Sequence, residues 1–360
     1  EAGVVDNSRK PLNTGKTIAT FMMGSAHMYD FVSDNPDISQ PEIAQKTGLS
    51  LQTVNKTVRE LEQAATIICT GVSSFTGGRR AKTYRANLNR GFLACVYISE
   101  DVFYGKVTNL GETTLRSCKY RRDASHSWLE NLTQCLTKLM DGFVVDEIGI
   151  AVPGTVTNNI IYNIPAIPEF EGMNLKERIA EVFQCKVLVE NDMRSAAIWA
   201  YVENVDSSAK NANIAYISVL DHLGASFIAN GKLLPSNNGF SGEIAYMALN
   251  EREKNRSQSG CADLMLEETL ASGRTELLVE MLSRIMVNIC CVMAPEVVVL
   301  ATDHLHAEHA DALRRGMTRY IQERYIPDIK VVPVVPENNL QGIISICRNH
   351  MESTIQVVRG

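Results

Sequence analysis

The sequence predicts an α/β protein that begins with a winged helix-turn-helix, itself an α+β domain, over residues 1–86. Two observations support this prediction. Near the N-terminus, short capped helices meet at a glycine turn and are followed by a strand hairpin. After Arg90, apolar strands alternate with amphipathic helices, which is the pattern of an α/β core.

The N-terminal helices carry start and stop signals. Residues 17–32 have apolar side chains at helical spacing, and the Asn-Pro pair at 35–36 ends that pattern. Ser39 and Glu42 form a capping box at the start of a second helix. Gly48 ends this helix, because glycine accepts the positive φ of a helix C-terminus.

Ser50 is expected to cap a third helix, which has one apolar and one polar side. The apolar side repeats at helical spacing through Val54, Val58 and Leu61. The second helix of a helix-turn-helix enters the major groove of DNA, where Gln and Asn pair with adenine and Lys reaches guanine or phosphate. Hydroxyl groups could equally bind backbone phosphates. The residues of this helix expected to contact DNA are Ser50, Gln52, Thr53, Asn55, Lys56 and Arg59.

A wing is expected directly after this helix. Residues 66–69 are predicted as a strand, 71–78 as a hairpin tip and 82–85 as the return strand. Arg79 and Arg80 stand at the base of the hairpin, where they would reach a phosphate or a minor groove. An ordinary helical hairpin is the alternative, but the capping box, glycine turn, polar face and basic wing occur together and favour DNA binding.

Charge is distributed unevenly along the chain. The net charge is −6, yet residues 50–90 hold seven basic and two acidic side chains. The overall charge argues against a protein that coats nucleic acid in general, whereas a local basic segment is the electrostatic footprint of a phosphate-binding surface. A solvated helix face followed by a basic linker would give the same composition.

Beyond Arg90, the expected elements follow one another in the order of an α/β core. Strands are predicted over residues 92–98, 102–107, 144–152, 186–190, 214–219, 225–229 and 296–300. Helices are predicted over residues 128–140, 175–183, 192–202 and 277–293, of which the last could supply an apolar surface to a dimer.

Composition narrows the class of protein further. The nine cysteines include no C-x-x-C pair and mostly occupy apolar runs, which is typical of reduced thiols in a cytoplasmic protein. No stretch approaches the roughly 20 apolar residues of a membrane span. Residues 1–16 are polar, so we expect no signal peptide.

Four segments of the body carry a resemblance to a known family. They are residues 148–157 (IGIAVPGTVT), 187–198 (VLVENDMRSAAI), 214–249 and 295–301 (PEVVVLA). In order and spacing they resemble the ROK family (repressors, open reading frames and sugar kinases). The N-terminal half, with the GGRRA link at 77–81, resembles the repressor branch of that family.

The resemblance implies a two-lobed actin-like, ribonuclease H-like fold, with a first lobe over residues 87–200 and a second over 201–360. It also implies an ATP site, and here the sequence departs from the family. Kinases of the family carry an Asp-x-Gly-Gly-Thr loop, whereas residues 96–103 contain no glycine and include two acids, Glu100 and Asp101. A second glycine-rich turn is replaced by the Ala-Thr-Asp sequence at 301–303. A kinase must hold ATP and balance its charge, so we expect no enzymatic activity.

The sugar side of the family's cleft is better preserved. An Asn-Asp pair and a Gly-Glu pair match the family, an Asn occupies a sugar-contacting position, and a Tyr replaces a His. The ligand-binding residues that the resemblance implies are Asn163, Asn191, Asp192, Glu243 and Tyr246. Asp192 has an alternative role as a helix N-cap, because it follows a strand and begins a helix.

Two further positions stay open. Arg194 stands where the family usually has Asn; if it faces the cleft it favours an anionic effector, whereas a surface ion pair is the simpler interpretation. Either Glu267 or Glu268 could match a later sugar-binding Glu of the family.

The family's zinc site requires one His and three Cys. Tyr246 stands in place of the His, and in the corresponding run at 254–261 only Cys261 remains. Structural zinc requires its full set of ligands, so we expect no zinc, and we expect no other cofactor.

Together these features predict a sequence-specific transcription regulator, acting as a repressor of carbohydrate metabolism. It would bind double-stranded DNA as a homodimer or higher homo-oligomer and respond to a sugar or sugar derivative in the cleft. Two alternatives remain: a sugar kinase with an unusual ATP loop, and a regulator without an effector whose body serves only for dimerisation.

Overall fold

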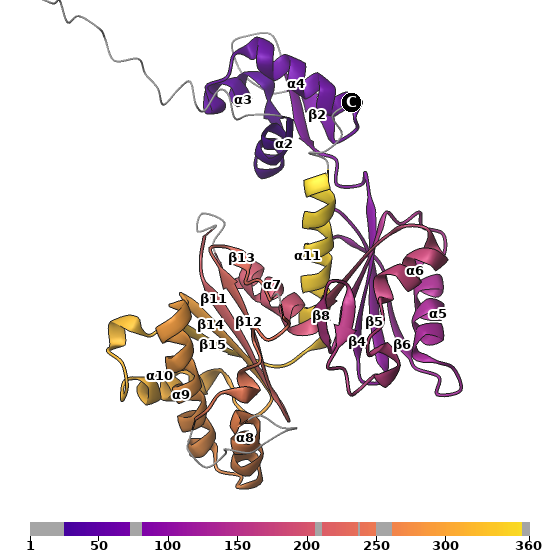
Figure 1. Cartoon of the computed structure of the whole chain (residues 1–360). Coiled ribbons are helices and arrows are strands. Elements are labelled where there is room, and N and C mark those ends of the chain that lie inside the picture. Colours follow the sequence, from indigo (N-terminus) through magenta and orange to yellow (C-terminus); the bar gives the residue numbers. More distant parts are fainter. Residues whose placement is uncertain (1–24, 73–80, 206–210, 237, 250–260, 355–360) are drawn as a thin grey trace, which may run out of the picture. The chain divides into compact units, whose positions relative to one another are not determined.

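The computed structural model describes residues 25–72, 81–205, 211–236, 238–249 and 261–354. It contains two compact units, one formed by residues 1–90 with 351–360 and the other by residues 91–350 (Figure 1). Each unit has its own apolar core, and each is described by itself below.

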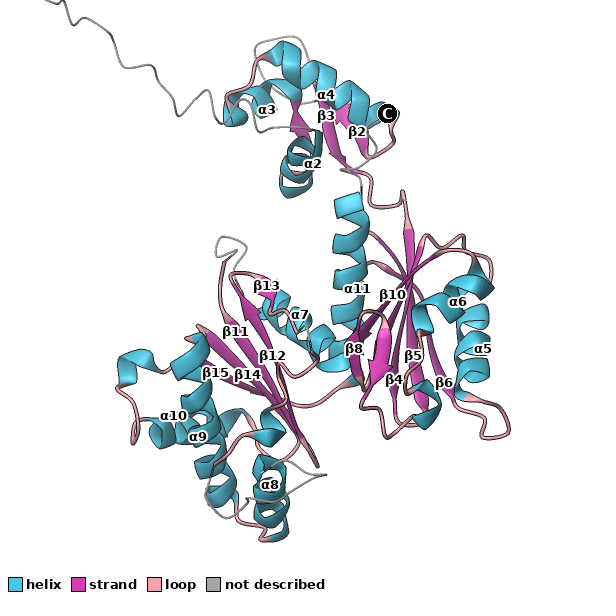
Figure 2. Cartoon of the chain, in the orientation of Figure 1, coloured by secondary structure: helices cyan, strands magenta, loops and turns pink. Residues whose placement is uncertain are grey.

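The first unit is a winged helix-turn-helix (Figure 2). Its helices are α2 (Ser25–Asp34), α3 (Gln40–Thr47) and α4 (Leu51–Gln63). Its antiparallel sheet has the order β1-β3-β2, with β1 (Ile38–Ser39), β3 (Lys82–Ala86) and β2 (Ile67–Val72). The predicted second and third helices and both wing strands are confirmed. Residues 17–24 of the predicted first helix and most of the predicted hairpin tip lie outside the described residues.

The capping box and the glycine turn predicted from the sequence fix the two ends of α3. The carboxylate of Glu42 accepts hydrogen bonds from the Ser39 amide at 2.9 Å and the Ser39 hydroxyl at 2.6 Å, and these bonds lower the pKa of Glu42. Gly48 adopts φ 71° and donates its amide to the Ala44 carbonyl, which closes α3. Buried Ile43 and Val54 then join α3 and α4 in one core cluster.

The second unit contains two five-stranded sheets with matching topology. The first has the order β10-β7-β4-β5-β6, built from β4 (Phe92–Ser99), β5 (Val102–Asn109), β6 (Thr114–Arg121), β7 (Glu147–Val152) and β10 (Lys186–Asn191). The second has the order β13-β12-β11-β14-β15, built from β11 (Ile214–Val219), β12 (Leu223–Ala229), β13 (Lys232–Leu233), β14 (Val297–Thr302) and β15 (Asp328–Val332). In each sheet the first three strands in sequence are antiparallel and the last two run parallel to the first. A short hairpin, β8 (Thr155–Thr157) with β9 (Ile160–Tyr162), follows β7.

One face of each sheet is covered by helices of its own lobe (Figure 1). α5 (Trp128–Met140) and α6 (Leu175–Phe183) pack on the first sheet. α8 (Cys261–Ala271), α9 (Thr275–Met293) and α10 (Ala310–Met317) pack on the second. The predicted two-lobed α/β fold is therefore confirmed.

The remaining two long helices are exchanged between the lobes. α7 (Asp192–Asn204) follows the last strand of the first sheet but packs against β11 and β12 of the second. α11 (Pro336–Thr354) follows the last strand of the second sheet, and its Ser345 hydroxyl donates to Glu112, beside the first sheet, at 3.0 Å. The expected boundary between residues 200 and 201 falls inside α7, so it assigns most of α7 to the first lobe and all of α11 to the second, whereas each helix lies on the sheet of the other lobe.

α7 and α11 approach each other closely. A side chain at Gly342 would collide with the backbone carbonyl of Ser195, so only glycine permits this crossing. Beside it, the buried Asn339 amide donates to the Asp192 carbonyl at 3.0 Å. The first residue of α7 is therefore held directly by α11.

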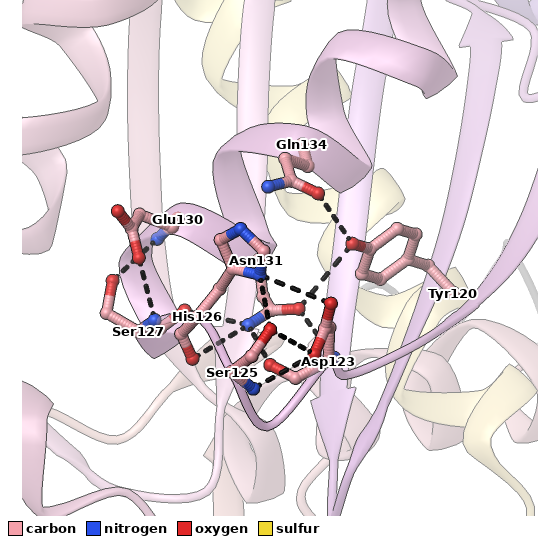
Figure 3. A network of polar contacts seen from close by, with 8 residues as sticks. All are labelled: Tyr120, Asp123, Ser125, His126, Ser127, Glu130, Asn131 and Gln134. Carbon is pink, nitrogen blue, oxygen red and sulfur yellow. Dashed lines mark hydrogen bonds and ion pairs between the residues drawn. The ribbon is translucent and has the colours of Figure 1, made fainter.

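The loop between β6 and α5 is organised by one buried side chain, Asn131 (Figure 3). Its amide nitrogen donates to the carbonyls of Asp123 at 2.9 Å, His126 at 3.2 Å and Ser127 at 2.8 Å. Its oxygen accepts the Asp123 amide at 2.8 Å. These bonds tie the loop backbone to the first turn of α5, which gives this polar cluster a structural role.

All nine cysteines lie within the described residues and are free thiols; Cys118 and Cys135 bring their sulfurs to 3.8 Å. Among the residues that the structure describes, no helix is both long enough and apolar enough to cross a membrane.

Candidate nucleic-acid interface and ligand pocket

The first turn of α4 is organised by two of the residues predicted to contact DNA. The Ser50 hydroxyl accepts the Thr53 amide at 3.1 Å and lies 2.8 Å from the Thr53 hydroxyl. Ser50 is the N-cap of α4, as predicted. Part of the hydrogen-bonding capacity of both hydroxyls is therefore used inside the helix.

The other predicted contact residues of α4 are exposed, namely Gln52, Asn55, Lys56 and Arg59. Lys56 lies 4.0 Å from Glu60, but both side chains are well exposed, so water screens this pair and leaves the lysine available. Val54, Val58 and Leu61 are buried on the other side. The helix therefore presents a polar, basic surface opposite its core.

The wing carries its own charge arrangement. Arg85 donates to both carboxylate oxygens of Asp37, at 2.9 and 3.1 Å. A hydrogen bond from Thr70 and this arginine lower the pKa of Asp37. Arg85 is therefore partly neutralised, although it belongs to the basic segment. Arg79 and Arg80 lie outside the described residues, and their placement stays a prediction.

A polar cavity of about 190 Å³ lies in the second unit. Four of the five residues expected to bind a ligand line it: Asn163, Asn191, Asp192 and Glu243. They come from different parts of the chain: the end of the β8–β9 hairpin, the end of β10, the start of α7, and the residue before a 3₁₀ turn at Ile244–Tyr246. The fold thus brings together residues separated by up to 80 positions.

Asn191 and Asp192 have different roles at the start of α7, and the sequence left open whether Asp192 is the N-cap. Asn191, rather than Asp192, is the N-cap of α7, because its side-chain oxygen accepts the Arg194 amide at 3.1 Å. Its amide nitrogen donates to the Gly154 carbonyl at 3.0 Å. Asp192 is the first helical residue, and its Oδ1 accepts the Met193 amide at 2.8 Å. The alternative of Asp192 as the N-cap is therefore wrong.

The electrostatics of the cavity centre on Asp192. Burial raises the pKa of this carboxyl to about 7, hydrogen bonds from its neighbours oppose the shift, and Glu243 adds to it. Burial also raises the pKa of Glu243. Asp192 in turn adds to the effect of burial in raising the pKa values of Tyr97 and Tyr216. An acid with a pKa near neutrality can either donate or accept hydrogen bonds to a hydroxylated ligand.

Arg194 both faces the cavity and forms an ion pair, the two roles that the sequence left open. It lines the cavity, yet its Nε donates to Glu190 at 2.9 Å and its Nη1 to the Leu234 carbonyl at 2.9 Å. Only 25% of the Arg194 side chain and 18% of the Glu190 side chain are exposed, so the pair is shielded from solvent. The positive charge that would attract an anion is already balanced.

Tyr246 does not join the other four candidates. It lies half-exposed against Phe240, with ring centroids 5.6 Å apart, in a neighbouring apolar cavity of about 320 Å³ that also includes Val292. Gly242 and Glu243 line both cavities and therefore form a wall between them. Glu267 and Glu268 are exposed on α8 and do not line the polar cavity.

The polar cavity also includes residues that were not singled out from the sequence. Among them are Thr155, Ser236 and Ser241, and the Ser236 hydroxyl accepts the Ser241 amide at 3.0 Å. Each lies in a segment that carried the family resemblance. The polar residues of those segments, taken together, could have been named as candidates.

The structure describes both segments in which the glycine-rich ATP-binding loops of the family are expected to be missing. Glu100 and Asp101 form a two-residue turn between β4 and β5, with φ 50° at Glu100. At the end of β14, the Thr302 hydroxyl accepts the His304 amide at 3.1 Å, and the Asp303 carboxylate accepts the Val334 amide at 3.2 Å. The side chains at the second turn therefore serve the local backbone.

Cys261, the one remaining candidate from the family's zinc site, begins α8. The preceding run at 254–260 lies outside the described residues. Within the described part of the chain, no cluster of three or more His, Cys, Asp or Glu side chains could hold a metal ion.

Two family models match this chain. One described as ROK family matches residues 94–275, and one described as winged helix-turn-helix DNA-binding matches residues 29–64. The first covers the body that holds the polar cavity, and the second covers the segment that contains α3 and α4.

Curated relatives include regulators from two bacteria. The xylose repressor of Bacillus subtilis (strain 168) is 28% identical over 246 residues, which cover 65% of this chain and 63% of the repressor. The DNA-binding transcriptional dual regulator NagC of Escherichia coli (strain K12) is 23% identical over 265 residues, covering 69% of this chain and 62% of that protein. The matched part of the chain thus spans less than two thirds of each relative.

Solved structures with the same fold include a regulator and an enzyme. A ROK family transcriptional regulator, a homolog of the E. coli MLC protein, has a TM-score of 0.74 at 17% identity and covers 93% of this chain and 98% of its own. The ROK hexokinase of Thermus thermophilus has a TM-score of 0.60 at 17% identity, covering 73% of this chain and 99% of its own. At such identities the likeness establishes the fold alone.

Proposed function

Since this chain belongs to the ROK family and carries a winged helix-turn-helix, we propose that it is a sequence-specific DNA-binding transcription regulator. In this proposal it acts as a repressor of carbohydrate genes, and a sugar or sugar derivative in the polar cavity controls its binding to the operator. The relative named as a xylose repressor supports this direction of control.

The observation that carries the proposal is the combination of two sites in one chain. The surface of α4 offers Gln52, Asn55, Lys56 and Arg59 to a major groove. The cavity offers amide and carboxyl groups to a hydroxylated ligand. A sugar-responsive regulator needs both, whereas a sugar kinase needs only the second.

The cavity favours an uncharged sugar over a sugar phosphate or sugar acid. Asp192 and Glu243 are acidic groups that would repel an anion when ionised. The cation at the cavity, Arg194, is paired with Glu190. A neutral polyhydroxylated ligand can exchange hydrogen bonds with all of these groups without an uncompensated charge.

Phosphoryl transfer is not part of the proposal. ATP requires backbone amides and cations around its phosphates, whereas the β4–β5 turn presents Glu100 and Asp101. The turn after β14 offers Thr302 and Asp303, which bond to the local backbone. ADP release measured with a panel of sugars tests this directly, and turnover that disappears in Asp192→Asn would favour the kinase.

DNA binding is tested by selecting bound fragments from a random pool with the purified full chain at physiological salt. We expect a short inverted repeat with half-sites one helical turn apart or a multiple of it, because a homodimer presents two α4 helices related by symmetry. A folded protein that enriches no sequence would refute the regulator.

The contact surface is tested by the double variant Lys56→Ala/Arg59→Ala on the selected operator. Each lost phosphate contact reduces the slope of log K against log salt by about 0.9, so the slope falls by up to about two units. The double variant Lys176→Ala/Arg178→Ala removes the same charge from the exposed face of α6 and serves as the control. An unchanged slope in the α4 variant would contradict the assignment.

The effector is sought by thermal unfolding with neutral sugars, sugar phosphates and sugar acids. A ligand at ~100 times its dissociation constant adds about 2.7 kcal/mol to stability. Asp192→Ala should abolish the stabilisation. If no sugar stabilises the wild type while the operator is still bound, a regulator without an effector replaces the sugar-responsive one.

A further inference from the structure

The base-reading end of α4 carries one side chain of unexpected chemistry. Leu51 is the first residue of the helix and is 48% exposed. Every residue of α4 is described, and among its exposed side chains Leu51 alone is apolar. Its neighbours on the same surface are polar residues of the candidate DNA interface, including Gln52 and Asn55.

The core of the first unit does not account for Leu51. The residues that pack the start of α4 are Leu49 before the cap and Val54 in the second turn, which are the positions of a hydrophobic staple. Both are buried in one cluster together with Val58 and Leu61. Leu51 is absent from that cluster, so packing of the core does not explain why this position carries an apolar residue.

The position of Leu51 in the helix is informative. The first turn of a recognition helix lies nearest the base edges in the major groove. The two hydroxyls nearest to Leu51 are partly engaged with each other, because the Ser50 hydroxyl accepts the Thr53 amide and lies 2.8 Å from the Thr53 hydroxyl. The first turn therefore leads into the groove with an apolar group, flanked by a glutamine and, one helical turn later, by Asn55.

We infer that Leu51 packs against the C5-methyl group of a thymine in each operator half-site. This inference rests on the proposed function, since it requires α4 to enter the major groove. Among the four bases, only thymine presents an apolar group there, and apolar side chains recognise it. Residues four apart on a helix are neighbours, so Leu51 and Asn55 would read adjacent features, a thymine methyl and an adenine edge.

The test removes only the methyl group. In the selected operator, each thymine of both half-sites is replaced in turn by deoxyuridine, which keeps every hydrogen bond, and affinity is measured by fluorescence anisotropy with the full chain. We expect one thymine per half-site at which this replacement weakens wild-type binding roughly fourfold, because the complex then buries one methyl group fewer. In Leu51→Ala, binding to the thymine operator weakens at least as much, and the same replacement has no further effect.

Two further variants make the result specific. Leu51→Met keeps an apolar side chain and should keep the sensitivity to deoxyuridine. Leu115→Ala removes a leucine that is 43% exposed on β6, outside α4, and should behave like the wild type. Alanine at an exposed first helical position is well tolerated, so Leu51→Ala is expected to fold.

Each outcome bears on the inference. If no thymine is sensitive to loss of its methyl group, or if Leu51→Ala retains the sensitivity, the assignment of Leu51 is wrong while operator binding stands. If no operator is enriched at all, the proposed function and this assignment fail together.

Discussion

Asp192 illustrates what a single residue adds to the interpretation of a sequence. The resemblance placed it in a ligand site, and a strand followed by a helix made an N-cap equally reasonable. The structure gives the capping bond to Asn191 and leaves Asp192 buried in the cavity, with its Oδ1 on the Met193 amide. Adjacent Asn and Asp both cap helices well, so only geometry separates their roles.

Asp192 makes stability depend on pH. Its pKa is raised from 3.8 to about 7 in the folded chain, so the native state binds the proton more tightly than the unfolded state. The resulting stabilisation is complete below about pH 4 and is lost as pH rises through 7. From this group we expect a loss of roughly 2–3 kcal/mol between pH 5 and pH 8, which Asp192→Asn should not show.

The measurement is denaturant unfolding of both proteins at several pH values, with exposed Asp141→Asn as the control. At pH 8 Asp192→Asn should be the more stable protein, because it buries no charge. An equal pH slope in the wild type and Asp192→Asn would show that this carboxyl is not perturbed by burial.

Glu190 determines the charge that the cavity presents. It balances Arg194 at 2.9 Å, and both side chains are largely shielded. Glu190→Gln keeps the shape and removes the counter-charge. We expect a sugar phosphate or sugar acid to bind about tenfold more tightly to this variant, since a charge-assisted hydrogen bond becomes available to the ligand.

Calorimetric titration of a neutral sugar and its phosphate ester into each protein measures this change. Glu181→Gln breaks an exposed ion pair with Arg178 on α6 and should change neither affinity. A wild type that already prefers the phosphate ester would mean that Glu190 does not neutralise Arg194. The sequence offered an ion pair for Arg194, but it could not reveal the second hydrogen bond, to the carbonyl of Leu234 40 residues away.

At the scale of secondary structure, the sequence predicts best those elements whose ends carry local chemistry. α3 and α4 follow from Ser39, Glu42, Gly48 and Ser50, each of which acts within four residues. Strand β7 was expected from residue 144, but Val144 is 87% exposed and the strand begins at Glu147. An apolar run alone does not show where sheet pairing begins.

Other elements escaped prediction although a signal existed. α11 was not predicted, yet its buried residues Leu340, Ile343, Ile344 and Cys347 repeat at helical spacing. β6 was also missed, because it is an edge strand whose residues are exposed or only partly buried. Its sequence, TLRSCKYR, is mostly polar or charged and offers no apolar run of the kind that indicates a buried strand.

The turn between α3 and α4 provides a test of helix termination. Gly48 has φ 71°, and an added Cβ would meet no atom within 4 Å. Gly48→Ala therefore costs only the strain of the left-handed conformation, about 1 kcal/mol. We expect amide hydrogen exchange in α3 and α4 of the full chain to accelerate about fivefold.

Gly142→Ala provides the matched control. Gly142 has φ 79° with the same open surroundings, but it lies in the second unit. Its substitution should leave exchange in α3 and α4 unchanged, and Gly48→Asn should accelerate exchange less than Gly48→Ala, since asparagine tolerates this conformation. Exchange that is identical in the Gly48→Ala variant and the wild type would show that this turn does not limit opening of the helices.

At the scale of the whole molecule, the arrangement of the lobes depends on an exchange that sequence reasoning does not detect. Alternating strands and helices favour a helix that returns to its own sheet. α7 and α11 instead pack on the sheet of the other lobe, and Gly342 permits their crossing at Ser195. The two lobes could be predicted from the resemblance, but the boundaries at 200 and 201 could not capture this exchange.

This crossing suggests how the ligand cavity could influence the first unit. α7 begins at Asp192 in the cavity, and Asn339 of α11 donates to the Asp192 carbonyl at 3.0 Å. The proposed control of operator binding by a sugar requires a structural element that both sites bias, and we propose that α11 senses the cavity, because it holds the first residue of α7.

Asn339→Ala tests this coupling. Loss of the bond to the Asp192 carbonyl should reduce the factor by which the effector changes operator affinity, while both ligands still bind. The factor is measured in both directions, as operator affinity with and without sugar and as sugar affinity with and without operator, because linkage requires the two values to agree. Asn349→Ala, an exposed position on the same helix, is expected to retain the wild-type factor. If the two variants behave alike, the signal does not pass through this contact, and the chain segment between residues 86 and 92 becomes the next candidate.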